Sequence, residues 1–295
     1  RRYRSARFFH LLVIERRQFV RGAVITRDFL YYLRDLHTMA DLLSGKTAVV
    51  TGASSGNGRA IARTFAEHGA DVVVADVQEE PRLGGTPTHE LIAADTASKS
   101  SFVNCDVTSN EDLREAILEA DEYGGIDVMV NNAGIFAHNE DLYSVDEDEY
   151  RTMMDINSKG PYFGSQFAAE RMQESGGGNI INLSSINGDI GTKSNVVYCA
   201  SKGAVRVMTY ALADALGPEI RVNAIHPGMI ETAQIVEDYA HLEESERQDR
   251  LETIPLGRKG RPDEIANAAL FLASDLASYV TAASLTVDGG VMNTR

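Results

Sequence analysis

The chain has 295 residues, a length that suits one large domain or two small ones; 43% of the residues are hydrophobic and 24% are charged, which is ordinary for a globular chain with a sizeable core. Its formal net charge is −15, and an acidic surface repels nucleic acid and anionic membranes, which argues against both as partners. The same charge fits either ordinary solubility or an adaptation to high salt, in which surface carboxylates keep the protein hydrated.

Cysteine and histidine usage argues against two further kinds of site. The two cysteines, Cys105 and Cys199, form no C-x-x-C pair, and the seven histidines form no H-x-x-x-H pair. We therefore expect no disulfide scaffold and no metal site, and a reducing cytoplasm as the location. No run of about 18 apolar residues occurs in the chain, so no transmembrane span is expected.

Residues 1–38 differ in composition from the rest of the chain. They contain nine Arg and three acidic residues, a net charge of +6 against −15 for the whole chain. An Arg-rich targeting peptide and a basic arm that docks on a partner or on lipid are both compatible with this pattern. We favour a third interpretation, in which Met39 is the native start, because the charge changes there. The expected organisation is a basic extension over 1–38 and one domain over 39–295.

From Ser44 onward, short β-branched runs alternate with longer helical runs. The expected strands are 47–50, 71–76, 101–106, 126–132, 179–185, 220–226 and 284–290, and the expected helices are 58–69, 111–124, 146–174, 198–216 and 262–274. This alternation predicts a single doubly wound α/β domain of the Rossmann type, with a parallel sheet of about seven strands and helices on both faces. Two long excursions that follow strands, 78–99 and 229–256, are expected to build ligand sites.

The sequence TGASSGNG at 51–58 places three glycines between the first strand and the first helix. Glycines there let the backbone approach a phosphate, and the helix N-terminus favours an anion; a plain Gly-Ser loop is the alternative. The second strand ends at Asp76, 18 residues after Gly58, where a carboxylate can accept hydrogen bonds from a ribose diol. Asp76 would repel a 2′-phosphate, and no Arg follows it directly, so we expect NAD as the cofactor in preference to NADP.

The sequence YCASK places Tyr198 and Lys202 one helical turn apart. A nearby cation lowers the pKa of a phenol from about 10 toward neutrality, which would make Tyr198 a general acid/base, although such pairs are also common on helix surfaces. Ser184 and Ser185 end the preceding strand, at the sheet edge that carries the glycine turn, where a hydroxyl can hold a substrate oxygen. Asn157 lies within a helical run, where a buried amide is disfavoured unless it has a partner.

With these motifs in this order, the chain resembles the short-chain dehydrogenase/reductase family from about Leu43 to Val291. TGASSGNG is similar to the family's TGxxxGxG turn, Tyr198 and Lys202 to its YxxxK pair, and Ser185, 13 residues before Tyr198, to its serine. Further similarities are the Asp106-Val107 pair, NNAG at 131–134, Asn157, HPGMIET at 226–232 and VDGG at 287–290.

The resemblance implies an oxidoreductase that transfers hydride between a nicotinamide and a carbinol or carbonyl carbon. The implied catalytic residues are Asn157, which holds a water of a proton relay, Ser185, which stabilises the substrate oxygen, Tyr198, which transfers the proton, and Lys202, which lowers the Tyr198 pKa and binds the nicotinamide ribose. The implied cofactor-binding residues are Gly52, Ser54, Ser55, Gly56, Asn57, Gly58, Asp76, Val77, Asp106, Val107, Asn132, Ala133, Gly134, Tyr198, Lys202, Pro227, Gly228, Ile230 and Thr232.

Two features depart from the family pattern. Asn57 stands where the family usually has Ile, and the segment 78–99 is longer than the family norm.

Substrate contacts are expected in 187–197, in 229–256 and after Gly134, a set that includes Ile135, Phe136, His138, Asp189, Ile190, Asn195 and Val196.

The expected substrate is a small secondary alcohol or ketone, such as a polyol or a sugar. The alternatives are a 3-oxoacyl thioester carried by acyl-carrier protein and, in another class, a non-catalytic NAD-sensing protein. Family members commonly form tetramers through helices that correspond to 146–174 and 198–216, so we expect a homotetramer or a homodimer.

Overall fold

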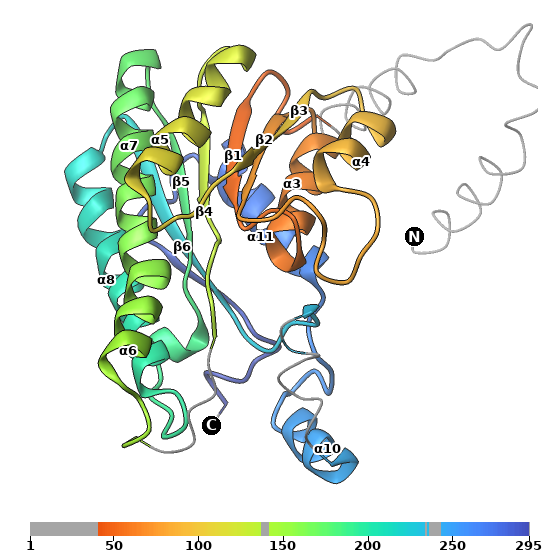
Figure 1. Ribbon diagram of the computed structural model, residues 1–295, viewed down its shortest axis with the longest axis vertical. Coiled ribbons are helices and arrows are strands. Elements are labelled where there is room, and N and C mark those ends of the chain that lie inside the picture. The colour runs from red at the N-terminus through yellow and green to blue at the C-terminus, as the bar shows by residue number, and fades with distance from the viewer. Residues whose placement is uncertain (1–40, 137–141, 234, 236–242, 295) are drawn as a thin grey trace, which may run out of the picture. The chain divides into compact units, whose positions relative to one another are not determined.

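The computed structural model describes residues 41–136, 142–233, 235 and 243–294 (Figure 1). The predicted extension at 1–38 and the candidate substrate residue His138 lie outside these residues. No helix of the described chain is long and apolar enough to cross a membrane.

Seven parallel strands form one sheet in the order β3-β2-β1-β4-β5-β6-β7, which confirms the predicted doubly wound sheet. The strands are β1 (Thr47–Thr51), β2 (Asp71–Asp76), β3 (Ser100–Asn104), β4 (Val128–Asn131), β5 (Gly178–Leu183), β6 (Ile220–Pro227) and β7 (Ser284–Val287). The chain winds outward from β1 to β3 and then returns to pair β4 with the other side of β1. Ligands of such folds bind at the carboxyl ends of the strands where the winding reverses, which here is between β1 and β4.

Helices cover both faces of the sheet (Figure 1). Those that pack on it are α3 (Gly56–Glu67), α4 (Thr88–Asp95), α5 (Asn110–Leu118), α7 (Gly160–Ser175), α8 (Val196–Leu216) and α11 (Pro262–Ala273). Of the other described helices, α6 (Glu147–Met154) packs on α8, and α10 (Glu244–Glu252) lies away from the sheet (Figure 1). Successive strand residues point to opposite faces: Val50 packs with Phe65 of α3 and Ile265 of α11, whereas Val49 packs with Leu113 of α5 and Phe167 of α7. Both faces of β1 are therefore buried, as the apolar run in the sequence predicts.

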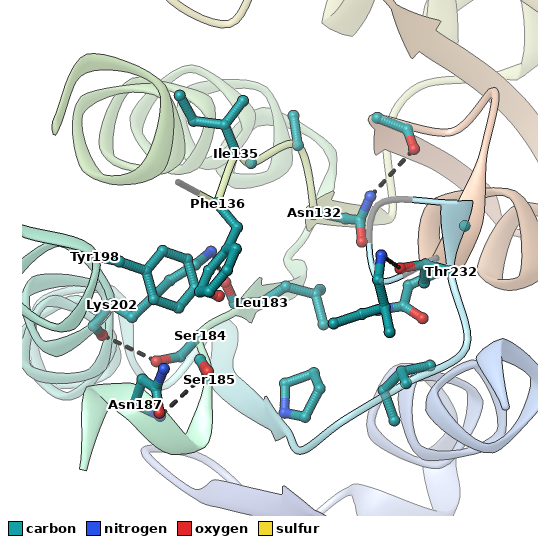
Figure 2. A pocket seen from close by; sticks show the side chains of 18 of the residues that line it. Asn132, Ile135, Phe136, Leu183, Ser184, Ser185, Asn187, Tyr198, Lys202 and Thr232 are labelled. Carbon is teal, nitrogen blue, oxygen red and sulfur yellow. Dashed lines mark hydrogen bonds between the residues drawn. The ribbon is translucent and has the colours of Figure 1, made fainter. Parts of the chain in front are cut away.

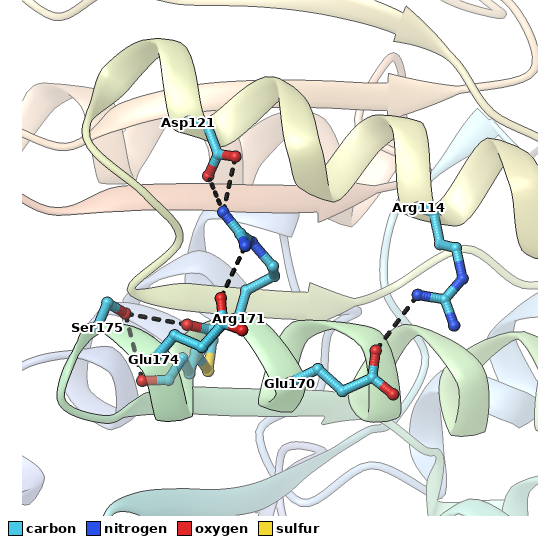
Figure 3. A network of polar contacts seen from close by, with 7 residues as sticks. Arg114, Asp121, Glu170, Arg171, Glu174 and Ser175 are labelled. Atoms are coloured by element: carbon cyan, nitrogen blue, oxygen red, sulfur yellow. Dashed lines mark hydrogen bonds and ion pairs between the residues drawn. The ribbon is translucent and has the colours of Figure 1, made fainter.

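Ion pairs join α7 to the chain around α5 at the surface (Figure 3). Arg171 donates to both carboxylate oxygens of Asp121, at 3.0 and 2.8 Å, and Arg114 pairs with Glu170 at 3.2 Å. The Arg114 guanidinium also lies 3.6 Å from the centre of the Phe167 ring. These side chains are largely exposed, so each pair contributes about 0.2–1 kcal/mol, and the buried helix faces supply most of the attachment.

Two predicted segments differ from their expected form. The helical run at 146–174 contains a π-helical segment at Asp155–Lys159, between α6 and α7. The excursion at 78–99 contains the helix α4, whose buried Ile92 belongs to the core. The apolar residues of this helix are consecutive, at 91–94, and only Ile92 among them is buried, so the sequence shows little helical periodicity and the helix was not predicted.

Candidate active site

A cavity of about 620 Å³ lies at the carboxyl ends of the strands and takes residues from the segments after β1, β2, β3, β4, β5 and β6 (Figure 2). The predicted site residues that line it are Gly52, Ser55, Gly56, Asn57, Asp76, Val77, Asp106, Val107, Asn132, Ala133, Gly134, Ser185, Tyr198, Lys202, Pro227, Gly228, Ile230 and Thr232. Three others, Ser54, Gly58 and Asn157, do not line the cavity and lie behind its wall. The strand ends thus bring residues that are far apart in the sequence to one site.

The glycine turn ends at the N-terminus of α3. The helix begins at Gly56, its N-cap Ser55 makes no side-chain capping bond, and its first turn carries no acidic residue. The positive end of the helix dipole therefore faces an uncapped turn at the cavity wall, which fits an anionic pyrophosphate. Gly52 and Gly56 have φ values of +66° and +55°, in the region that favours glycine.

Gly58 allows the turn to fold onto the ends of β1 and β4. A Cβ atom at this position would lie 2.2 Å from the Gly52 carbonyl oxygen and 2.5 Å from Asn132 Nδ2. Asn132 Nδ2 itself donates to the carbonyls of Thr51 and Gly52, at 2.9 and 3.2 Å. Gly58 therefore serves the close packing of the turn, and its neighbours contact the cavity.

We expect Gly58→Ala to destabilise the protein by about 3 kcal/mol, because the added methyl group meets backbone atoms that cannot move without shifting the turn. Urea denaturation measures this difference. Gly191→Ala is the matched control, since nothing lies within 4 Å of a Cβ placed there. Equal stability changes in the two variants would contradict the packing role of Gly58.

Asp76 is held at the end of β2 by the turn. The backbone N–H of Ser54 donates to Asp76 Oδ2 at 2.9 Å, and the Ser54 hydroxyl donates to the Gln78 carbonyl at 2.6 Å. The second carboxylate oxygen is left for a ligand in the cavity, and its position fits the ribose that the sequence predicts. Ser54 acts here through Asp76, which explains its place behind the wall.

The excursion after Asp76 packs over the glycine turn. Arg59 of α3 donates to the Thr86 carbonyl and to the Thr88 hydroxyl, both at 2.9 Å, and Thr88 donates to the Ala53 carbonyl at 2.9 Å. The Arg82 backbone N–H donates to the Ser55 hydroxyl at 2.8 Å. These bonds place Arg82 on the cavity wall.

Arg82 was missed because the sequence reasoning considered only the residue directly after Asp76. The available signal was its position as the first cationic residue after that carboxylate.

Tyr198 and Lys202 lie on α8, on the side of the cavity away from Asn132 and Thr232 (Figure 2). The Tyr198 ring packs edge-on against Phe136, with 4.9 Å between ring centres. Lys202 is 5% exposed, its Nζ donates to the Leu183 carbonyl at 2.8 Å, and Nζ lies 5.9 Å from the centre of the Tyr198 ring. Burial lowers the pKa of Lys202 to about 8.

The pKa of Tyr198 is shifted in the direction opposite to the predicted one. Burial, the largest effect, raises it to about 12, while a hydrogen bond with Ser185 acts in the opposite direction. The predicted lowering by Lys202 is wrong for this structure, because the ammonium group contacts a backbone carbonyl and not the phenol. At neutral pH the phenol is therefore a proton donor.

The two serines at the end of β5 have different partners. Ser184 donates to the Lys202 carbonyl at 2.9 Å and so supports α8. Ser185 caps the short helix η3 (Ile186–Gly188), accepting from the Asn187 N–H at 3.1 Å, and its hydroxyl lies close enough to the Tyr198 phenol to act on its pKa. Of the two hydroxyls, Ser185 is the one placed beside the phenol.

Asn157 lies in the π-helical segment and is fully buried. Its Oδ1 accepts from the Ile135 N–H at 2.8 Å, and its Nδ2 donates to the Ile135 carbonyl at 2.8 Å and to the Ser201 hydroxyl at 3.2 Å. A Cβ atom at Gly134 would lie 3.1 Å from Asn157 Oδ1 and 3.4 Å from Lys202 Nζ. The amide thus fixes the strand-end backbone close to the lysine.

The remaining wall combines apolar and amide side chains. The lining residues that belong to the predicted substrate segments are Ile135, Phe136, Asn187, Ile190, Thr192, Ser194, Asn195, Met229, Ile235, Arg250, Thr253 and Ile254. Val291 also lines the cavity, although it was not predicted to do so. Asn195 is 8% exposed, and its Oδ1 has no hydrogen-bond partner within the described chain. Two predictions are wrong: Val196 is 48% exposed outside the cavity, and Asp189 contacts His226 and Arg206 instead.

The chain is similar to known oxidoreductases over most of its length. Residues 52–292 match the family described as Enoyl-(Acyl carrier protein) reductase. The chain is 44% identical to the L-rhamnose 1-dehydrogenase (NAD(P)(+)) of Azotobacter vinelandii, over 85% of this chain and 98% of the relative. It is 39% identical to the 3-oxoacyl-[acyl-carrier-protein] reductase of Chlamydia muridarum, over 86% and 100%, and 38% identical to glucose 1-dehydrogenase 2 of Bacillus subtilis, over 84% and 95%.

Solved structures are similar over the same region. A short-chain type dehydrogenase/reductase from Mycobacterium marinum has a TM-score of 0.78 at 35% identity, covering 87% of this chain and 99% of that one. A putative 2-deoxy-D-gluconate 3-dehydrogenase from Agrobacterium tumefaciens with bound NADP has a TM-score of 0.77 at 34% identity, covering 86% and 98%. With the parallel sheet and the motifs in the same order, these similarities show that the chain belongs to the short-chain dehydrogenase/reductase family of oxidoreductases.

Proposed function

We propose that the protein oxidises a hydroxyl group of a small sugar or polyol with NAD, or catalyses the reverse reduction. The observation that carries this proposal is the placement of the Ser185 hydroxyl close enough to the Tyr198 phenol to lower its pKa, in a cavity that the glycine turn and Asp76 also line. The cavity therefore joins an acid/base pair to a surface that suits a dinucleotide. Two of the relatives are named as rhamnose and glucose dehydrogenases, which supports a sugar substrate.

The residues present fit a nicotinamide dinucleotide along the cavity. The uncapped N-terminus of α3 suits the pyrophosphate, Asp76 suits the adenosine ribose, and the unused N–H bonds of Lys202 suit the nicotinamide ribose. When bound, the nicotinamide accepts or supplies the hydride.

Side chains of the protein transfer the proton and assist that transfer. In reduction, the protonated Tyr198 phenol donates its proton to the substrate carbonyl oxygen, and the Ser185 hydroxyl donates a hydrogen bond to the same oxygen. In oxidation, the Tyr198 phenolate takes the proton from the substrate hydroxyl. The second lone pair of Asn157 Oδ1 is suited to hold a water that carries the proton between Lys202 and solvent.

The wall beside Tyr198 favours a substrate with several hydroxyl groups. Asn187, Ser194 and Asn195 line the cavity, and the buried Asn195 oxygen needs a donor. A sugar supplies such hydroxyl donors at neighbouring carbons, whereas an acyl chain supplies none. The similarity to the Chlamydia muridarum reductase makes a 3-oxoacyl thioester the second candidate.

A substrate panel tests this proposal. L-rhamnose, D-glucose and simple polyols are offered with NAD, and acetoacetyl thioesters are offered with NADH, while nicotinamide absorbance is followed. We expect kcat/KM for the best sugar to exceed that for the best thioester by at least about tenfold, since unpaired buried acceptors penalise a substrate without donors. A thioester preference would establish the second candidate, and no turnover on either class would favour an NAD-binding protein without catalysis.

Cofactor choice is expected to depend on Asp76 and Arg82 in opposite ways. Asp76→Ala is expected to lower kcat/KM with NAD about tenfold and to raise it with NADP, because a carboxylate that binds the ribose diol also repels a 2′-phosphate. Arg82→Ala is expected to lower kcat/KM with NADP alone, since Arg82 is a cation on the same part of the wall. Rates with both cofactors measure these effects.

Arg63→Ala is the control for these two variants, because Arg63 is an exposed arginine of α3 that pairs with Glu67. It is expected to leave both rates within about twofold of the wild type. A ratio of NAD to NADP activity that Asp76→Ala leaves unchanged would contradict the assignment of Asp76.

We also propose that the chain self-associates through α8. Ala204, Val207 and Ala211 follow one another at helical spacing and are exposed. Sedimentation is expected to show a dimer or a tetramer, and a charge at Val207 is expected to weaken it.

A further inference from the structure

The short helix η3 connects the candidate catalytic serine to an acidic residue. Ser185 caps its N-terminal end, and Asp189 is the residue at its C-terminal end. The Asp189 side chain is 14% exposed and does not line the cavity. A helix of three residues has little stability of its own, so the contacts at its two ends determine where Ser185 lies.

Asp189 bonds to two other elements that carry site residues. One carboxylate oxygen contacts Nδ1 of His226, which directly precedes the cavity residue Pro227 on β6. The other lies 2.9 Å from Nε of Arg206, one helical turn beyond Lys202 on α8. A single carboxylate therefore joins the segments that carry Ser185, Lys202 and Pro227.

The outer end of this cluster is anchored to the sheet. The Arg206 Nε–H donates to the Tyr210 hydroxyl at 3.0 Å, and that hydroxyl bonds with the Ser284 hydroxyl of β7 at 2.7 Å. Arg206 is partly exposed, so the cation remains solvated while its inner face contacts Asp189. Contacts with β6 and α8, and through Tyr210 with β7, therefore fix the position of Asp189.

His226 depends on Asp189 for its hydrogen bonding. The ring is fully buried, and within the described residues its Nε2 has no hydrogen-bond partner. Burial lowers the pKa of His226, while the Asp189 carboxylate and the Ser185 backbone both act to raise it. Removing the carboxylate would leave a buried ring without the one side-chain partner it has among the described residues, which is costly, and would release the end of η3.

We propose that Asp189, clamped between His226 and Arg206, is a positioning residue that fixes the Ser185 hydroxyl beside Tyr198. The inference rests on the proposed function, because it takes the task of Ser185 to be holding the substrate oxygen. A displacement of about 1 Å at such a group can lower a rate by about 100-fold, so the clamp acts on turnover through Ser185 and not through direct contact with substrate.

A double-mutant cycle tests this inference. Asp189→Leu is expected to lower kcat about 30-fold in the wild-type background, within the range for misplaced groups, and less than about threefold in a Ser185→Ala background. The affinity for NAD, measured by fluorescence titration, is expected to stay within about threefold in every variant. Asp214→Leu, which removes an exposed carboxylate of α8, is the control and is expected to leave kcat within about twofold.

Equal losses in the two backgrounds, or no loss in the wild-type background, would overturn the inference. If Asp189→Leu fails to fold, Asp189→Asn and His226→Gln take its place in the same cycle, and a loss of NAD binding in these variants would show a general structural role and overturn the inference as well. Hydrogen exchange of the 186–190 amides adds a readout that needs no turnover: faster exchange in Asp189→Leu, with no change in Asp214→Leu, is expected. A wild type without oxidoreductase activity would refute the proposed function, whereas unchanged exchange would refute the inference by itself.

Discussion

Tyr198→Phe is expected to lower kcat by about 10³-fold while leaving the melting temperature within a few degrees of the wild type. The variant keeps the ring that packs against Phe136 at 4.9 Å and removes only the hydroxyl that moves the proton, and general acid–base catalysis contributes 10²–10⁴-fold. Initial rates with the best sugar or ketone measure the loss. Because burial raises the pKa of Tyr198 to about 12, the wild-type rate of alcohol oxidation is also expected to rise with pH as the phenolate fraction grows.

Tyr162→Phe is the matched control, since Tyr162 is a partly exposed tyrosine of α7. It is expected to retain the wild-type rate and its rise with pH. If Tyr198→Phe retained either of them, Tyr198 would not be the group that transfers the proton.

Lys202→Met is expected to abolish most activity and, at neutral pH, to stabilise the protein by about 2 kcal/mol. Burial lowers the pKa of Lys202 to about 8 from an ordinary value of 10.5. Each pKa unit corresponds to about 1.4 kcal/mol, and the lost bond to the Leu183 carbonyl offsets about 1 kcal/mol of the gain. A residue kept at a cost in stability is typical of a functional site.

The pH dependence of this gain follows from the direction of the shift. Between about pH 8 and 10.5 the unfolded chain binds more protons than the folded chain, so wild-type stability rises with pH across this range. The advantage of Lys202→Met is therefore complete below about pH 8 and declines toward pH 10.5. Thermal unfolding at several pH values measures it, and Lys193→Met, at an exposed lysine, is expected to show no such trend. A destabilised Lys202→Met variant at pH 7 would contradict a buried, costly ammonium group.

The sheet could be predicted because its signal is local. Runs such as TAVV and DVVVAD contain three and four consecutive apolar residues, as a strand buried on both faces requires; both are parallel strands in the structure. The glycine turn was predictable for the same reason, since the close approach of Gly58 to the Gly52 carbonyl excludes any side chain. In both cases the type of residue alone indicates the structural constraint.

Side-chain direction and depth of burial could not be predicted in the same way. Asp189 was assigned to the substrate wall because it lies in the right segment, but its direction depends on His226 and Arg206, which are distant in the sequence. The spacing of Tyr198 and Lys202 predicted their shared helix face, yet the pKa of the phenol depends on burial, which spacing does not report. Asn57, the departure in the glycine turn, lines the cavity, and its buried Oδ1 has no hydrogen-bond partner in the part of the chain that the structure describes; the structure gives no reason for its choice over Ile.

The most direct test of the account uses an aldose, D-glucose or L-rhamnose, that carries deuterium on the carbinol carbon. The protein is incubated with this sugar and NAD, and the reduced dinucleotide is analysed by mass spectrometry. The account predicts one deuterium in the reduced dinucleotide and, in Tyr198→Phe, formation of the same product at about a thousandth of the wild-type rate. Reduced dinucleotide without deuterium, or the same rate in both proteins, would contradict it.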